Sequence, residues 1–213
     1  MSRIFSVRLR PAALLLPAIA LLAPGVGGCA SPANLTLTSV DHRQAYTQPF
    51  TQAFCSRCDG GNVDVVLVDR AAEEAMRGET VTAPVKQVMH IQVLWTAARE
   101  MKAVTSNAAI KWYVIGSQPH DVLEYTGTAF VALASTEDGA TLTIRRSTLK
   151  PAENHGNLAD PVGASHMEGT ITAHVDEQTV NRLLGELQSA SVAAAVARPS
   201  VARTEGGEKS IVP

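Results

Sequence analysis

Hydrophobic residues recur at strand spacing along most of the chain between residues 63 and 175. Short apolar runs, or alternating apolar and polar positions, predict strands when turn residues bound them. The segments that fit this pattern are 63–68, 85–95, 110–115, 122–134, 140–149 and 167–175. Asp138-Gly139 is a strong hairpin signal, which pairs 122–134 with 140–149 in antiparallel orientation. The strand pattern therefore predicts an antiparallel sheet.

Two further segments have helical patterns. Residues 71–77 are strong helix formers, and Gly78 follows them as a natural stop. Asp176 is a good N-cap, and the apolar residues after it recur at helical spacing: Val180, Leu183, Leu184 and Leu187. The predicted fold class is thus α+β, with an antiparallel sheet of five to six strands, a short helix at about 71–77 and a C-terminal amphipathic helix at about 177–189.

The chain divides into four parts by composition. Residues 1–28 contain a basic start and an apolar stretch at 12–24, which is too short for the ~20 residues of a membrane span and is typical of a signal peptide. Residues 29–45 are small and polar, so we expect a flexible tether. A single globular domain is expected over 46–190, and a mostly disordered tail over 191–213.

The end of the predicted signal peptide contains a short motif. Residues 26–29 are Val-Gly-Gly-Cys, an aliphatic residue, two small residues and a cysteine. This motif resembles the lipobox of bacterial lipoproteins. The resemblance implies a diacylglyceryl group on the Cys29 thiol, cleavage before Cys29 and acylation of the new amino terminus, with palmitate as the expected kind of acyl chain. Ordinary signal-peptidase cleavage after Ala30 is the alternative, because Gly28-Cys29-Ala30 also fits a small-x-small rule.

The same resemblance implies a location in the bacterial cell envelope. In the family's sorting rule an aspartate after the cysteine retains lipoproteins at the inner membrane. Neither Ala30 nor Ser31 is that aspartate, so the outer membrane is favoured over the inner. Two or three acyl chains would hold a small domain firmly at the membrane, since each buried methylene contributes about 0.8 kcal/mol.

The chain has 3 cysteines, and assigning Cys29 to the lipid leaves Cys55 and Cys58 as a Cys-x-x-Cys pair. In an oxidising compartment the default expectation is a local disulfide between them. A redox-active pair is one alternative, although a turn and a strand follow the motif where a thioredoxin-like site has a helix. A zinc site is another alternative, but the nearest histidines, His42 and His90, provide no recognisable second pair of ligands.

Charge narrows the possible partners. Lys+Arg number 18 and Asp+Glu 20, and without Arg3, Arg8 and Arg10 of the leader 15 basic residues remain against the same 20 acidic ones. A mildly acidic domain is not expected to bind nucleic acid through bulk charge. The partners predicted from the sequence are the membrane, through the N-terminal lipid, and a protein or cell-wall partner in the envelope.

Candidate chemistry is sparse. The segment 151–165 reads as an irregular surface loop, and it runs from His155 through Asp160 to Ser165 and His166. A base, an acid and a hydroxyl in one segment could serve nucleophilic catalysis, but such compositions usually form turns. We therefore predict no catalytic residue, no metal site and no cofactor. The predicted function is a non-enzymatic binding or assembly module, and the alternative is a periplasm-facing hydrolase or thiol-redox protein.

Overall fold

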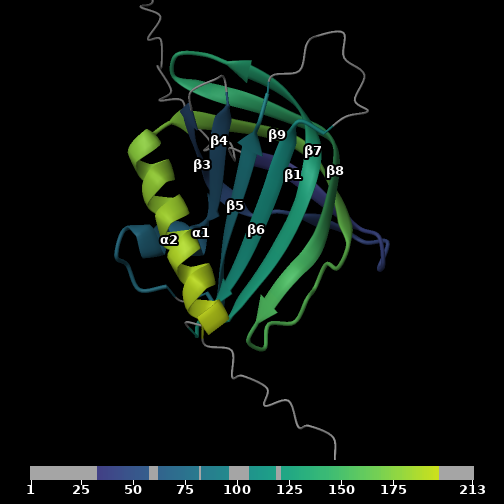
Figure 1. Ribbon diagram of the computed structural model, residues 1–213, viewed down its shortest axis with the longest axis vertical. Helices are drawn as coiled ribbons and strands as arrows, with labels where there is room; N and C mark the ends of the chain where they lie inside the picture. Colours follow the sequence, from purple (N-terminus) through teal and green to yellow (C-terminus); the bar gives the residue numbers. More distant parts are fainter. Residues whose placement is uncertain (1–32, 58–61, 82, 96–105, 119–120, 197–213) are drawn as a thin grey trace, which may run out of the picture. The chain divides into compact units, whose positions relative to one another are not determined.

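Figure 1 shows a computed structural model of the chain, which describes residues 33–57, 62–81, 83–95, 106–118 and 121–196. These residues belong to the second of two compact units, Ser31–Pro213. The described elements are β1 (Ala33–Ser39), β2 (Ala45–Thr47), β3 (Phe50–Arg57), β4 (Val63–Asp69), α1 (Arg70–Met76), β5 (Val85–Val93), β6 (Ala108–Gly116), β7 (Val122–Ser135), β8 (Gly139–His155), β9 (Ser165–Val175) and α2 (Glu177–Val196).

The strands form one sheet that closes on itself. Its order is β2-β1-β9-β3-β4-β5-β6-β7-β8, and β9 also pairs with β8. Strands β3 to β9 therefore make a closed seven-stranded barrel, and β1 and β2 extend the sheet beyond β9. The closing contact is a short parallel pairing of β3 with β9, in which Phe54 lies opposite His174 and Cys55 opposite Val175.

The barrel has an apolar interior. Side chains that point inward from every barrel strand form one buried cluster, and Leu35 and Leu37 of β1 complete it. Trp112 of β6 stacks on Tyr125 of β7 with a centroid distance of 4.6 Å. This cluster is the main core, because in a small barrel inward-facing side chains fill the lumen.

The two helices lie on the outside of the barrel (Figure 1), and a second apolar cluster lies beneath them. Val66 and Val68 of β4 point outward and pack against Val180, Leu183 and Leu187 of α2. Strand β4 is consequently buried on both faces. The helical spacing of the α2 residues was predicted from the sequence, and the structure confirms that this stripe faces the sheet.

The predicted fold class is wrong. An α+β domain with five to six antiparallel strands was expected, whereas the described residues form a mostly β structure with nine strands, a closed barrel and two helices. All six predicted strands exist, as β4 to β9, and the helices begin within one residue of the predicted positions. The error lies in β1 to β3, which were not predicted, and in the closure, which requires a pairing between segments far apart in sequence.

Three predicted segment boundaries also change. Residues 33–39, assigned to the flexible tether, form β1 and pair with β9 along their whole length. Residues 151–155, assigned to an irregular loop, are the end of β8. The final helix continues to Val196, past the predicted end near 189. The predicted signal peptide, Cys29 and residues 197–213 of the predicted tail lie outside the described residues.

Candidate functional site

A groove lies on the outside of the barrel between α1 and α2, and it has a volume of about 260 Å³. We call it the α1–α2 groove. Its floor comes from β5 and β6, and each helix supplies one wall. The lining residues are Ala72, Ala75, Met76, Lys86, Val88, Ile115, Arg182, Leu183, Glu186, Leu187 and Ala190. Apolar side chains make the floor and both walls, while the three charged residues belong to β5 and α2.

The first wall, α1, has only seven residues, too few for a helix that is stable by itself. Asp69 caps it, because its carboxylate accepts a hydrogen bond of 2.8 Å from the Ala72 amide. Burial is the main cause that raises the pKa of Asp69, and hydrogen bonds to backbone amides act in the opposite direction. Ala71 and Ala72 are buried against the sheet, which adds packing to the cap.

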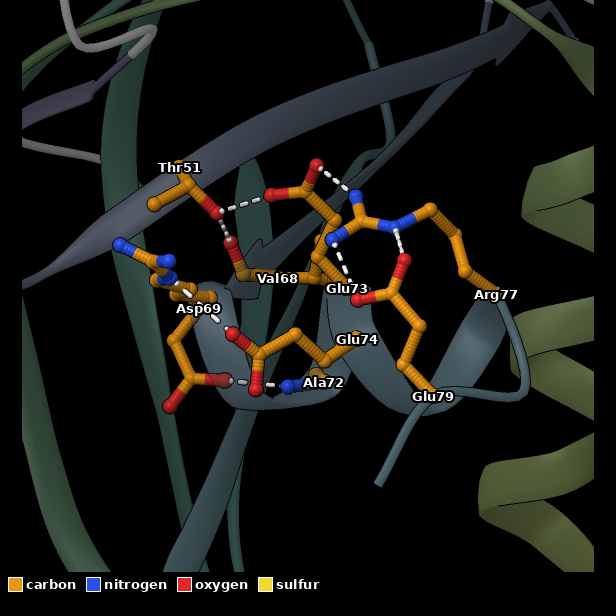
Figure 2. A network of polar contacts seen from close by, with 9 residues as sticks. Thr51, Val68, Asp69, Ala72, Glu73, Glu74, Arg77 and Glu79 are labelled. Atoms are coloured by element: carbon orange, nitrogen blue, oxygen red, sulfur yellow. Dashed lines mark hydrogen bonds and ion pairs between the residues drawn. The ribbon is translucent and has the colours of Figure 1, made fainter. Parts of the chain in front are cut away.

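A polar network ties the same helix to β3, as Figure 2 shows. The register between β3 and β4 shifts at Thr51, which is the extra residue of a β-bulge. The Thr51 hydroxyl donates to Glu73 at 2.9 Å, and Arg77 binds both Glu73 and Glu79. Glu74 forms its own ion pair with Arg70. The carboxylates of α1 thus have partners outside the groove, and none of these charged residues lines it.

The charged residues that do line the groove are arranged differently. Lys86, Arg182 and Glu186 form no ion pair with any residue that the structure describes. Lys86 acts on the charge of Asp69, and Arg182 acts on that of Asp176. Both carboxylates cap helices, and neither lines the groove. The groove therefore combines an apolar floor with two cations and one anion that are available to a ligand.

The predicted disulfide stays a prediction, since Cys58 lies outside the described residues. Cys55 is a buried free thiol that points into the barrel, and burial raises its pKa. Described β3 ends at Arg57, and in an extended strand Cα atoms three residues apart are about 10 Å apart. A disulfide tolerates at most ~7 Å, so the bond would require the chain to turn directly after Arg57.

The candidate catalytic residues of the 151–165 segment do not converge. His155 ends β8 opposite Val122, whereas Ser165 lies opposite Leu149, six residues earlier in the same strand. Six strand residues span about 20 Å. His166 is adjacent to Ser165 and bonds the Ser147 carbonyl at 2.8 Å through Nδ1. These positions do not form a nucleophile, base and acid in contact.

Asp160 has a structural role instead. It accepts a hydrogen bond from the Tyr125 hydroxyl and from the amides of Val162 and Gly163. Burial alone would raise the pKa of Asp160, but these hydrogen bonds outweigh burial and lower it. The carboxylate therefore fixes the turn before β9 to the barrel.

Sequence reasoning missed a pair of titratable residues on the outer face of the barrel. Asp64 and His90 face outward on the adjacent strands β4 and β5, and His90 Nε2 lies 2.7 Å from an Asp64 oxygen. Asp–His pairs can serve general base catalysis when a nucleophile lies next to the imidazole. Lys111 is the residue opposite His90 on β6, and Ser56 lies opposite Asp64 on β3, beyond the carboxylate. The signals that could have found this pair are the single carboxylate, Asp64, in the apolar run 63–68 and the alternation in 85–95, which places His90 on the polar face.

Within the described part of the chain, no three His, Cys, Asp or Glu side chains are grouped so that they could hold a metal ion. None of the described helices is long and apolar enough to cross a membrane. The fold and the site thus define a small closed β-barrel with two external helices and an amphipathic groove between them. No protein-family model matches the chain, and neither a curated protein nor a solved structure is significantly similar to it.

Proposed function

We propose that this chain is a non-enzymatic binding module, attached to the bacterial envelope by a lipid on Cys29, and that the α1–α2 groove is its binding site. The observation that carries the proposal is the groove itself. An apolar floor with a few convergent polar groups is the usual character of a binding site. Its α1 wall is fixed by the cap at Asp69 and by the Thr51–Glu73–Arg77 contacts, so the site is largely pre-formed.

The lipid anchor rests on the Val-Gly-Gly-Cys motif at 26–29. A groove on an anchored domain would capture its partner close to the membrane, where the anchor raises the local concentration of the domain. The outer membrane is the proposed site, because aspartate does not follow Cys29. The thiol-redox and hydrolase alternatives are less favoured, since Cys55 is buried with a raised pKa and no described nucleophilic hydroxyl lies beside His90.

Photo-crosslinking in intact cells tests the groove. A photoreactive amino acid replaces Ala75, which is exposed and lines the groove, or Gln188, which is exposed on α2 outside it. We expect a crosslinked protein partner, identified by mass spectrometry, from position 75 and not from position 188. Equal products from both positions, or none from either, would contradict the assignment of the groove.

Replacement of Cys29 tests the anchor independently. Intact mass of the wild-type protein should show cleavage before Cys29 and the mass of the lipid. Cys29→Ser should lose this mass and leave the membrane fraction. A wild-type protein that begins at Ser31 without lipid would establish ordinary cleavage after Ala30 and refute the anchor, while leaving the groove assignment untouched.

A further inference from the structure

We infer that the occupant of the α1–α2 groove is an amphipathic helix of a protein partner, with acidic side chains that meet Lys86 and Arg182. This inference rests on the proposed function and specifies the partner's chemistry. It is argued from the length of the groove, its volume and the distribution of charge around it.

The length of the groove suits about two turns of helix. Its α2 wall extends from Arg182 to Ala190, nine residues whose eight steps of 1.5 Å rise about 12 Å. A helix that binds in a groove inserts residues at i, i+3 or i+4, and i+7, which span about 10 Å. Two walls made by helices and a floor made by Val88 and Ile115 leave a channel of this form.

The volume favours side chains over a whole small molecule or lipid. The groove holds about 260 Å³, which is below the roughly 300–1,000 Å³ of pockets that enclose a ligand. Two or three apolar side chains of a partner can enter it while the rest of that partner remains outside. A lipid with two acyl chains would leave most of its apolar surface in water.

The charges in the groove determine which charge the partner's side chains should carry. Lys86 comes from the β5 floor and Arg182 from the α2 wall, so a helix in the groove would lie near two cations that form no ion pair with a described residue. The α1 wall adds no charge, because it presents Ala72, Ala75 and Met76. These cations belong to a chain with a formal net charge of −2, so the groove is locally more basic than the protein as a whole.

Glu186 gives the partner a direction. It lies one turn after Arg182 on α2, about 6 Å further along the wall. A partner helix therefore places an acidic residue toward Arg182 and a neutral or basic residue toward Glu186. A reversed helix would bring like charges together, which is unfavourable.

Two designed peptides test this chemistry with the full-length protein. Both carry leucines at i, i+3 or i+4, and i+7; one has glutamates beside the leucines and the other has lysines at the same positions. Binding of each fluorescent peptide is measured by anisotropy at low and high salt. At low salt we expect the acidic peptide to bind about three- to tenfold more tightly than the basic peptide. This is the range of affinity that two partly exposed ion pairs supply.

Charge reversal supplies matched variants. Lys86→Glu combined with Arg182→Glu should reverse the preference, so that the basic peptide binds more tightly. Glu186→Lys should strengthen binding of the acidic peptide several-fold. Gln188 is exposed on α2 outside the groove, so Gln188→Glu is the control. It should change the affinity of either peptide only slightly, because salt screens the effect of a distant charge.

Each contrary outcome identifies which statement fails. If photo-crosslinking at position 75 succeeds but both peptides bind equally, or neither binds, the acidic helix is refuted and the groove assignment stands. Binding of phosphatidylglycerol vesicles that displaces the acidic peptide would overturn the inference in favour of a lipid surface. If removal of residues 197–213 strengthens the binding of both peptides at least tenfold, the occupant of the groove is the chain's own tail. If the protein self-associates and Ala75→Glu abolishes this, the occupant is a second copy of the chain.

Discussion

Substituting Gly169 tests the pairing that joins β1 to the barrel. Gly169 lies in β9 between Leu35 of β1 and Ile144 of β8, with a φ of 141°. A β-carbon at this position would overlap the carbonyl oxygen of Asn34 in β1. Because that oxygen belongs to the backbone, no rotamer change relieves the overlap. Gly169→Ala must therefore distort β9 or displace β1.

The cost follows from these two effects. An alanine held in this backbone region is strained by roughly 1–3 kcal/mol. Displacing β1 also exposes part of Leu35 and Leu37, both fully buried, and full burial of one leucine contributes about 1.5–3 kcal/mol. We expect Gly169→Ala to lower the free energy of unfolding by about 3 kcal/mol or more, out of a typical total of about 5–15 kcal/mol.

Urea unfolding followed by circular dichroism measures this change, and Gly185→Ala is the matched control. Gly185 is exposed in α2, and nothing lies within 4 Å of the position where its β-carbon would be. Alanine there should stabilise the protein by about 0.5–1 kcal/mol through helix propensity. Gly169→Ala within 0.5 kcal/mol of wild type would refute the close packing of β1 on β9.

Three further predictions concern titratable groups. Asp176→Ala should destabilise the protein by about 1 kcal/mol at pH 7, because Asp176 caps α2 by accepting from the Thr179 amide at 2.9 Å. That hydrogen bond lowers the pKa of Asp176. In urea titrations at several pH values, the difference in the free energy of unfolding between wild type and Asp176→Ala should be complete above about pH 4. It should vanish as the pH falls through the lowered pKa. Asp69→Asn keeps an oxygen for the Ala72 amide and removes a buried carboxylate, so stability at pH 7 should stay equal or rise by up to about 1 kcal/mol. Because the pKa of Asp69 is raised in the folded protein, protonated Asp69 contributes stability at low pH. The wild type should lose this contribution as the pH rises from about 4 through the raised pKa, and Asp69→Asn should not. In the Cys58→Ser variant, Cys55 should react with a maleimide at pH 8 only on unfolding, as peptide mapping would show, and rapid labelling of the folded protein would contradict the burial of its thiol.

Local patterns predicted the local elements and failed at long range. Alternation and the Asp138-Gly139 turn were sufficient for β4 to β9, and the spacing of Val180, Leu183 and Leu187 was sufficient for α2. Strand β1 was missed because threonines and an asparagine alternate with Leu35 and Leu37, which made the segment look like a polar tether. Closure of the barrel depends on the pairing of Cys55 with Val175, 120 residues apart, for which no local signal exists.

The candidate site was unpredictable for the same reason. The α1–α2 groove combines residues from four elements, and none of the predicted site residues lines it. Met76, Lys86 and Arg182 each look like ordinary helix or strand residues when they are read singly. Conversely, His155, Asp160 and Ser165 looked like a cluster only because they are near in sequence. In a β-rich protein, strand register predicts which side chains lie close together better than closeness in the sequence does.

The groove itself follows from the unequal lengths of the two helices. Both pack on the same outer cluster, but α1 has 7 residues and α2 has 20, or about 10 Å against about 30 Å at 1.5 Å per residue. Helix α1 ends where the chain turns at Gly78, so among the described elements no helix lies beside the later turns of α2. Leu187 is buried by the sheet beneath, while Ala190 lines the open end of the groove. A partner helix seated in the groove between α1 and α2 would extend the helical layer on this face of the barrel.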